Sequence, residues 1–398
     1  MTSLAAPVLH EDAPSDAKAA WSAVFALTLC VSTLIASEFM PVSLLTPIAR
    51  DLHLSEGTAG QAISISGLFA VLTSLFIVRI SAGIDRRHLL MGLTGLMAVS
   101  GVVVAMAPNF LVLMIGRAMI GVVIGGFWSM SAATVMRLVP PADVPRALAL
   151  LNGGNALATT VAAPLGSFLG QYIGWRGAFF MVVPLAALTF VWKFFSLPNL
   201  PSPRESTGAG TFGVLSKPKV PVGMLAIAML FMGQFTIFTY FRPFLEQVTR
   251  VNVSTLSLIL LGLGAAGLLG NAVVGRFIAR SLRGTLFIMP ILMAMIACGL
   301  IWLGTVPLAT GLLLALWGCI GTAVPVAWWT WISRTLPDDA EAGGGLMVAV
   351  IQMAITLGAA GGGLLFDTYG YQAAFGAGAC LLVLAGLLGA ISPPVRGH

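Results

Sequence analysis

The stretch NGGNALATTVAAPLGSFLGQYIGWRGAF, residues 152–179, combines a long apolar run with a small residue at every fourth position. Residues four apart lie on one face of an α-helix. A stripe of small side chains lets two membrane helices approach closely. The stretch therefore predicts a membrane-spanning helix packed tightly against a neighbour along one stripe, formed by Gly154, Ala158, Ala162, Gly166 and Gly170.

The same pattern recurs 196 residues later along the chain. Ala354, Gly358 and Gly362 are in register with the three middle members of the first stripe. Each stripe is followed by a similar hexapeptide, GWRGAF (174–179) and GYQAAF (370–375). This repeat predicts two halves of common ancestry, and transporters built from such repeats place the substrate site at the interface of the repeats.

Apolar segments dominate the rest of the chain. Of its 398 residues 58% are hydrophobic and 9% are charged, with a mean hydropathy of +0.99, whereas a soluble domain carries about 25% charged residues. The period-2 alternation of a membrane barrel is absent, so the spans are expected to be helices. We predict an all-α integral membrane protein with twelve transmembrane helices in two pseudo-symmetric six-helix bundles, at 20–45, 58–80, 88–107, 110–136, 145–172, 177–197, 221–243, 253–278, 284–304, 307–333, 343–366 and 371–392.

The domain boundaries follow from the polar interruptions. We expect an N-terminal tail (1–19), a first bundle (20–197), a linker (198–220) rich in Pro, Ser and Gly, a second bundle (221–392) and a C-terminal tail (393–398).

The basic residues predict the orientation of the chain. Most Lys and Arg residues, Lys193 among them, are assigned to the loops and tails on one side of the membrane. The opposite loops hold only Arg50, Arg176, Arg242 and Arg250. By the positive-inside rule, both termini are expected in the cytoplasm of a protein spanning the bacterial inner membrane. The same rule accounts for the net charge of +6 without a nucleic-acid partner.

Two ionisable residues lie deep inside predicted spans, where they are costly and are functional candidates by default. Glu38 lies in the first span and Arg117 in the fourth. Desolvation favours the protonated form of a carboxyl, so Glu38 is the natural proton carrier; alternatively, it only pairs with a polar group to fix helix packing. Arg117 could pair with an acid, bind backbone carbonyls, relay a proton or serve as a structural anchor.

A short charged turn, GIDRR (83–87), separates the second and third spans. Asp85, Arg86 and Arg87 are expected to form a cytoplasmic gate, in which Asp85 caps a helix N-terminus or pairs with a neighbouring arginine. The turn could instead serve only to set the topology.

The polar groups available to a substrate are sparse and uncharged. Amides and flat aromatic rings suit a planar, neutral, hydrogen-bonding solute, although tryptophan also marks membrane interfaces and polar side chains also bond neighbouring helices. The candidates for substrate binding are Trp128, Asn152, Asn155, Gln234, Tyr240, Asn271, Trp328 and Gln352.

Other classes of function find little support in the sequence. No phosphate-binding loop occurs, the ion-filter patterns of channels are missing, and no cluster of acid, nucleophile or metal ligands suggests an enzyme. The four cysteines lie inside apolar runs without paired spacing, so neither disulfides nor a zinc site is expected. We expect no metal and no cofactor.

Three local motifs resemble the major facilitator superfamily, and the likeness extends over all twelve spans. DRR (85–87) resembles the loop between helices two and three. Arg117 with Gly121 and Gly125 is similar to the helix-four motif associated with proton coupling. Gly154, Ala163, Pro164 and Gly166 resemble the helix-five motif of antiporters, with Ala163 in place of a glycine. The resemblance implies alternating access between two bundles.

Longer runs are similar to narrower groups within that superfamily. EFMPVSLLTPIA (38–49) is similar to a stretch of the twelve-span drug:proton antiporters. Further runs resemble bacterial purine ribonucleoside efflux permeases: GGFWSMS (125–131), RLVPP (137–141), APLGSFLG (163–170), FTYFRP (238–243) and VPVAWWTWI (324–332). The resemblance implies a monomeric antiporter that exports inosine, guanosine and analogues in exchange for protons. The alternatives are an exporter of arabinose-like sugars or chloramphenicol-like drugs, and a membrane sensor or scaffold that transports nothing.

Overall fold

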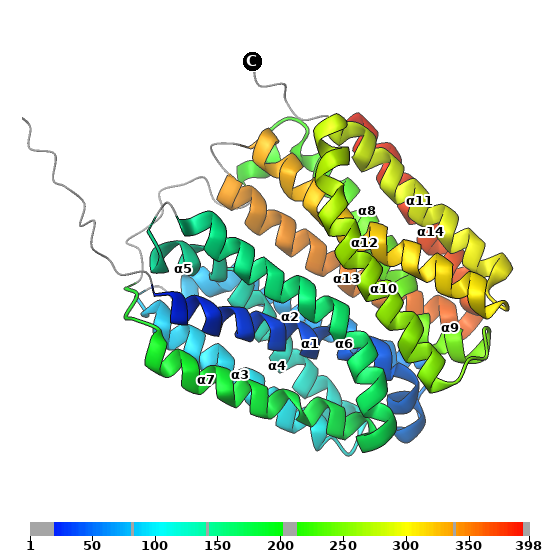
Figure 1. The fold of residues 1–398 in the computed structure, drawn as a ribbon, viewed down its shortest axis with the longest axis horizontal. Helices are drawn as coiled ribbons and strands as arrows, with labels where there is room; N and C mark the ends of the chain where they lie inside the picture. The colour runs from blue at the N-terminus through cyan, green and yellow to red at the C-terminus, as the bar shows by residue number, and fades with distance from the viewer. Residues whose placement is uncertain (1–19, 81–82, 141–142, 202–212, 337–339, 393–398) are drawn as a thin grey trace, which may run out of the picture.

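The computed structural model describes residues 20–80, 83–140, 143–201, 213–336 and 340–392, which are almost entirely helical and include no β-strand. The first bundle, blue to green in Figure 1, consists of α1 (Trp21–Asp51), α2 (Glu56–Ile80), α3 (Arg86–Ala105), α4 (Phe110–Trp128), α5 (Ser131–Leu138), α6 (Val144–Phe180) and α7 (Val182–Ser196). The predicted tails, 1–19 and 393–398, and the middle of the linker, 202–212, lie outside the described residues.

The second bundle lies beside the first and runs from green to red in Figure 1. A short 3₁₀ helix, η2 (Gly213–Ser216), precedes it. Its helices are α8 (Val220–Phe238), α9 (Phe241–Gln247), α10 (Val253–Arg280), α11 (Leu282–Leu303), α12 (Pro307–Thr335), α13 (Ala340–Tyr369) and α14 (Tyr371–Ile391).

The described part of the chain contains eleven apolar helical segments long enough to cross a membrane. One of them is long enough to cross it twice, which gives twelve crossings. This segment, Arg146–Ser196, contains 51 residues. At about 1.5 Å per residue it is far longer than a ~30 Å hydrocarbon core requires. Gly174 breaks it with a φ of 70°, and Gly370 has a φ of 82° between α13 and α14. Positive φ is readily adopted by glycine, which explains why a glycine begins both repeated hexapeptides.

Two predicted spans are divided in the structure. The span predicted at 110–136 is interrupted after Trp128, where the Ser129 hydroxyl donates to the carbonyl of Gly125 at 2.7 Å. Such local side-chain bonds compete with helix continuation. The span predicted at 221–243 is interrupted between α8 and α9 and extends to Gln247. Conversely, α1 runs six residues past its predicted end at residue 45, to Asp51.

Helix contacts follow a two-fold pattern that confirms the pseudo-symmetric bundles. The contact between α1 and α6 corresponds to that between α8 and α13, and α2–α4 corresponds to α10–α12. The two small-residue stripes lie in these contacts. Gly154 and Gly166 of α6 pack against Thr28 and Ser43 of α1, and Gly358 and Gly362 of α13 pack against Met232 and Thr236 of α8.

The bundles contact each other through α2 with α13 and α6 with α10. Hydrogen bonds between them gather where α2 begins and α13 ends, here termed the Asp367 end. The Gly57 amide and the Ser55 hydroxyl donate to the Asp367 carboxylate. At the same end, Gln247 Nε2 donates to Glu56 Oε1 at 3.0 Å.

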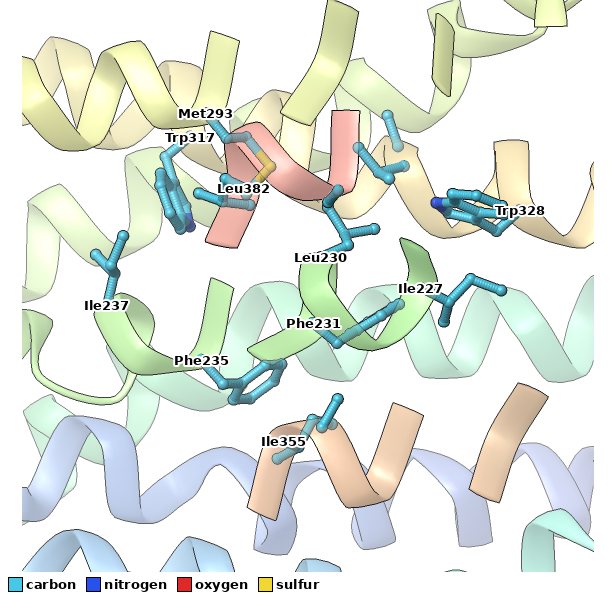
Figure 2. Packing of buried hydrophobic residues seen from close by; sticks show 14 of the residues in the cluster. Ile227, Leu230, Phe231, Phe235, Ile237, Met293, Trp317, Trp328, Ile355 and Leu382 are labelled. Atoms are coloured by element: carbon cyan, nitrogen blue, oxygen red, sulfur yellow. The ribbon is translucent and has the colours of Figure 1, made fainter. Parts of the chain in front are cut away.

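The second bundle has a dense aromatic and aliphatic core. Figure 2 shows Trp317, Trp328, Met293 and Leu382 around the α8 residue Leu230. All five side chains are buried. Trp328, a predicted substrate residue, is therefore part of this core.

The crossing of α10 and α12 depends on Gly270. A Cβ at this position would overlap the backbone of Cys319. We expect Gly270→Ala to lower the free energy of unfolding in detergent by about 1–3 kcal/mol relative to Gly275→Ala, because overpacking forces the helices apart. Gly275 lies on the same helix with open space around its Cα, so the gain in helix propensity cancels in the comparison. Equal stabilities of the two variants would contradict this packing.

Candidate substrate and proton site at the bundle interface

Glu38 lies near the middle of α1 at the junction of the two bundles. Its side chain is 6% exposed, and its Oε1 accepts a hydrogen bond from Gln352 Nε2 of α13 at 3.5 Å. Gln352 is itself 6% exposed. The acid of the first bundle is thus joined directly to an amide of the second.

Arg117 fastens three helices of the first bundle together. Its side chain is 1% exposed. From α4, Nη1 donates to the carbonyl of Ser37 on α1 at 2.8 Å, and Nε donates to the carbonyl of Ala62 on α2 at 2.9 Å. The Ser37 carbonyl is available because Pro41, four residues later, has no N–H to donate to it.

Glu38 and Arg117 are neighbours without forming a direct ion pair. Arg117 Nη2 donates to the backbone carbonyl of Glu38 at 3.2 Å and to Ser66 Oγ at 3.1 Å. The guanidinium therefore supports the helix backbone that carries Glu38, while the carboxylate faces Gln352.

Phe39, the residue after Glu38, meets two phenylalanines of the second bundle. The Phe39 ring lies 6.0 Å from that of Phe235, at an interplanar angle of 28°, and 6.2 Å from that of Phe238. Phe235 and Phe238 belong to α8. These residues give no distinct signal in the sequence, because phenylalanines are common in apolar spans.

Four of the predicted substrate residues are polar side chains of the second bundle with buried oxygen atoms, namely Gln234, Tyr240, Asn271 and Gln352. Besides Gln352, Gln234 packs beside Gly321, and both Gln234 Oε1 and Asn271 Oδ1 are buried without a partner. Tyr240 is fully buried, and its hydroxyl donates to the carbonyl of Ala359 at 2.8 Å.

The other four predicted substrate residues have different surroundings. Trp128 packs edge-on against Phe127. Asn152 is exposed and donates to the carbonyl of Leu148 on its own helix. Asn155 accepts from Thr159, and Trp328 packs against Trp331 in the second core. Only Gln352 is brought to Glu38 by a hydrogen bond.

The predicted antiporter motif lies where α6 meets α1 and α10. The Ser32 hydroxyl donates to the carbonyl of Gly154 at 3.0 Å. Pro164 leaves the carbonyl of Thr160 without its helical donor, and Gly264 of α10 packs directly on that carbonyl. Ala163 is buried at 6% exposure, and Gly166 packs on α1.

The charged turn before α3 is bound to the end of α7. Asp85 caps α3 by accepting from the Arg87 amide at 2.8 Å, and it also accepts from the Leu200 amide at 2.9 Å. Partial burial opposes the charged form, but these N–H donors hold the pKa of Asp85 below its ordinary value. Arg87 donates to the carbonyl of Phe194, and the Arg86 amide donates to that of Leu200.

Arg242 is a buried cation. Its predicted place in an outer loop is wrong. It lies in α9 at 4% exposure, and its Nε donates to Glu246 Oε1 at 2.9 Å. Its Nη1 donates to the carbonyl of Ser43 on α1, in the other bundle. Pro47 deprives that carbonyl of its helical donor, so the proline was the available signal for an external partner.

Lys193 is a second buried cation, and its assignment to an inner loop was also wrong. The residue lies inside α7, and its side chain is fully buried. Its Nζ lies 2.9 Å from both Cys30 Sγ and Thr94 Oγ1 and 5.4 Å from the centre of the Phe127 ring. Lys193 therefore connects α7 to α1, α3 and α4.

Across the residues that the structure describes, no group of three or more His, Cys, Asp or Glu side chains could hold a metal ion.

We expect Arg117→Gln to lower the free energy of unfolding in detergent by at least about 3 kcal/mol, because hydrogen bonds from a charged donor contribute about 1.5–3 kcal/mol each. Pro41→Ala restores an N–H for the Ser37 carbonyl. The loss caused by Arg117→Gln should therefore be smaller in the Pro41→Ala background. Arg280→Gln, at the exposed end of α10, is the control. Additive losses from Arg117→Gln and Pro41→Ala would contradict the role assigned to the freed carbonyl.

Two curated relatives match over nearly the whole chain. The transcription regulatory protein OpdE of Pseudomonas aeruginosa is 56% identical over 372 residues, covering 92% of each chain. The purine ribonucleoside efflux pump NepI of Salmonella enteritidis is 42% identical over 368 residues, covering 92% of this chain and 93% of the relative.

Solved structures of transporters share the fold. A bacterial homologue of the human lysosomal transporter Spinster, in an inward-facing and unoccupied conformation, has a TM-score of 0.72 at 16% identity, covering 94% of this chain and 95% of the other. The human organic anion transporter MFSD10 has a TM-score of 0.63 at 17% identity, covering 95% and 100%. The Major Facilitator Superfamily profile matches residues 25–347, and together with the twelve-span fold this establishes that the chain belongs to that superfamily of membrane transporters.

Proposed function

We propose that this protein exports purine ribonucleosides, such as inosine and guanosine, from the bacterial cytoplasm in exchange for protons. The observation that carries the proposal is the buried Glu38, which is bound to Gln352 across the bundle interface. A carboxyl at this position can bind a proton where the bundles separate. The 42% identity to a purine ribonucleoside efflux pump supports the substrate.

Coupling requires the two orientations of the bundles to differ in their affinity for the proton. An ionised Glu38 accepts from the Gln352 amide, which favours contact between the bundles at this level. Protonation weakens this bond by removing the charge. The proton on Glu38 thus changes the free energy of bundle separation, which is the requirement for exchange.

The predicted orientation places the Asp367 end on the periplasmic side. With both termini in the cytoplasm, α1 runs outward from Trp21 to Asp51. The bonds to Asp367 and the Arg242–Ser43 bond then close the periplasmic side. In the proposed export cycle, closure at this end is the state in which substrate enters from the cytoplasm.

A second candidate is a membrane sensor that transports nothing. The name of the 56% identical relative, a transcription regulatory protein, favours this alternative. A sensor predicts no substrate-dependent flux. An exporter of sugars or drugs predicts that those compounds are transported and that nucleosides do not compete with their transport.

Everted membrane vesicles with an imposed proton gradient, acidic inside, test the proposal. We expect wild type to accumulate labelled inosine. Glu38→Gln should lose at least about 90% of that accumulation, because a glutamine amide does not take up and release a proton as a carboxylate does. Asp143→Asn, which removes a carboxylate at the N-terminal end of α6, far along the helix from Glu38's contact with α13, is the control and should transport normally.

Accumulation that survives Glu38→Gln would keep the nucleoside substrate and move the proton site. Failure of well-expressed wild type to accumulate any purine nucleoside would contradict the proposed function.

The Arg242–Ser43 bond gives a separate test of gating. Arg242→Met keeps the length of the side chain but removes its donors. Ser257, near the start of α10, donates to Ser167 Oγ of α6 at 2.9 Å and so lies between the bundles. We expect Ser257→Cys in a cysteine-free background to react at least about tenfold faster with an impermeant thiol reagent on the periplasmic side, because losing a charged hydrogen bond of about 1.5–3 kcal/mol favours the open state.

Arg176→Met is the matched control for this experiment. Arg176 pairs with Asp51 at the same end, but inside the first bundle. Equal labelling rates in the Arg242→Met and Arg176→Met variants would show that Arg242 does not hold the periplasmic side closed.

A further inference from the structure

Gln352 leaves most of its hydrogen-bonding capacity unused in a buried position. A glutamine amide has two N–H donors and one oxygen with two lone pairs. Here Nε2 makes one long bond of 3.5 Å to Glu38, and Oε1 is buried without a partner. Nε2 therefore has an unused N–H and only one long bond, so it can donate to an acceptor of a ligand beside Glu38 without breaking a strong contact.

Three phenylalanine rings meet between the bundles one residue along α1 from Glu38. Phe39 adjoins Glu38 in sequence, and its ring faces Phe235 and Phe238 of the opposite bundle. Aromatic faces bind flat ring systems by offset stacking. Because Phe39 and Phe235 belong to different bundles, their separation changes whenever the bundles rock apart.

We propose that Glu38 and Gln352 read the N1–H and O6 edge of a 6-oxopurine, with the Glu38 carboxylate accepting from N1–H and Gln352 Nε2 donating to O6. This inference rests on the proposed function and specifies its substrate class. The base replaces the long Gln352–Glu38 bond with two bonds, one of them to a charged acceptor. The phenylalanines stack on the ring.

The arrangement discriminates among purines by the order of donor and acceptor on this edge. Hypoxanthine and guanine present a donor at N1 beside an acceptor at O6. Adenine presents an acceptor at N1 beside a donor at N6, the reverse order, so it matches the pair only when the base is turned over, which moves the ribose to the other side of the site. A site built to hydrogen-bond a ligand strongly rejects analogues that lack the matching group.

The same arrangement makes the base and the proton competitors for one acceptor. An ionised Glu38 accepts N1–H as a charged acceptor, whereas a protonated Glu38 offers only a neutral oxygen, which accepts more weakly. Release of the base and loading of the proton are then linked at a single side chain.

The test is inhibition of labelled inosine uptake into everted vesicles by unlabelled nucleosides. N1-methylinosine keeps O6 but lacks N1–H, and purine riboside lacks both groups without added bulk. We expect half-inhibition by these two compounds and by adenosine to need at least about tenfold more compound than inosine requires. The control probe 7-deazainosine keeps this edge and should inhibit like inosine.

Substitutions of Gln352 test the residue itself. We expect Gln352→Leu to lower the preference for inosine over adenosine by at least about tenfold, and Gln352→Glu, which presents an acceptor in place of the donor, to lower it further. Gln372→Leu, an exposed amide at the start of α14, is the matched control and should keep the wild-type preference.

The outcomes separate this inference from the proposed function. If inosine is transported but N1-methylinosine, purine riboside and adenosine inhibit equally well, the edge reading is wrong and nucleoside export stands. Unchanged discrimination in Gln352→Leu also overturns it. If no purine nucleoside is transported, the proposed function falls and the inference falls with it.

Discussion

The structure depends on one constraint: in hydrocarbon, each backbone carbonyl without a donor costs several kcal/mol. Prolines inside the helices create such carbonyls, and side chains or glycines of neighbouring helices meet them. Pro41 frees the carbonyl of Ser37, which Arg117 binds, and Pro47 frees that of Ser43, which Arg242 binds. Two costly buried charges and two costly carbonyls thus satisfy each other.

These arginine bonds differ in what they hold together. Arg117 joins α4 to α1 and α2 within one bundle, so it moves with that bundle and keeps the helix backbone around Glu38 fixed. Arg242 reaches from the second bundle to the first, so its bond must break when the bundles separate at the Asp367 end. The same chemistry therefore serves rigidity in one place and reversible closure in the other.

The sequence predicted the fold well because hydropathy and small-residue stripes act through local periodicity. It also identified Glu38 and Arg117, since an ionisable group inside an apolar run is conspicuous. It could not give their partners, because lateral contacts join helices that are distant in sequence. Lys193 and Arg242 were misplaced because they lie near the ends of spans, where snorkelling to the surface is the usual outcome.

The proposed exchange needs one group whose two states favour different bundle arrangements, and Glu38 is placed where it could be that group. Its backbone is held by Arg117 in the first bundle, while its carboxylate is read by Gln352 of the second. A change of charge on Glu38 therefore alters a hydrogen bond between the two bundles rather than a contact within one bundle. If a base and a proton bind the same carboxylate in turn, the exchange follows from that shared position, since each weakens the binding of the other.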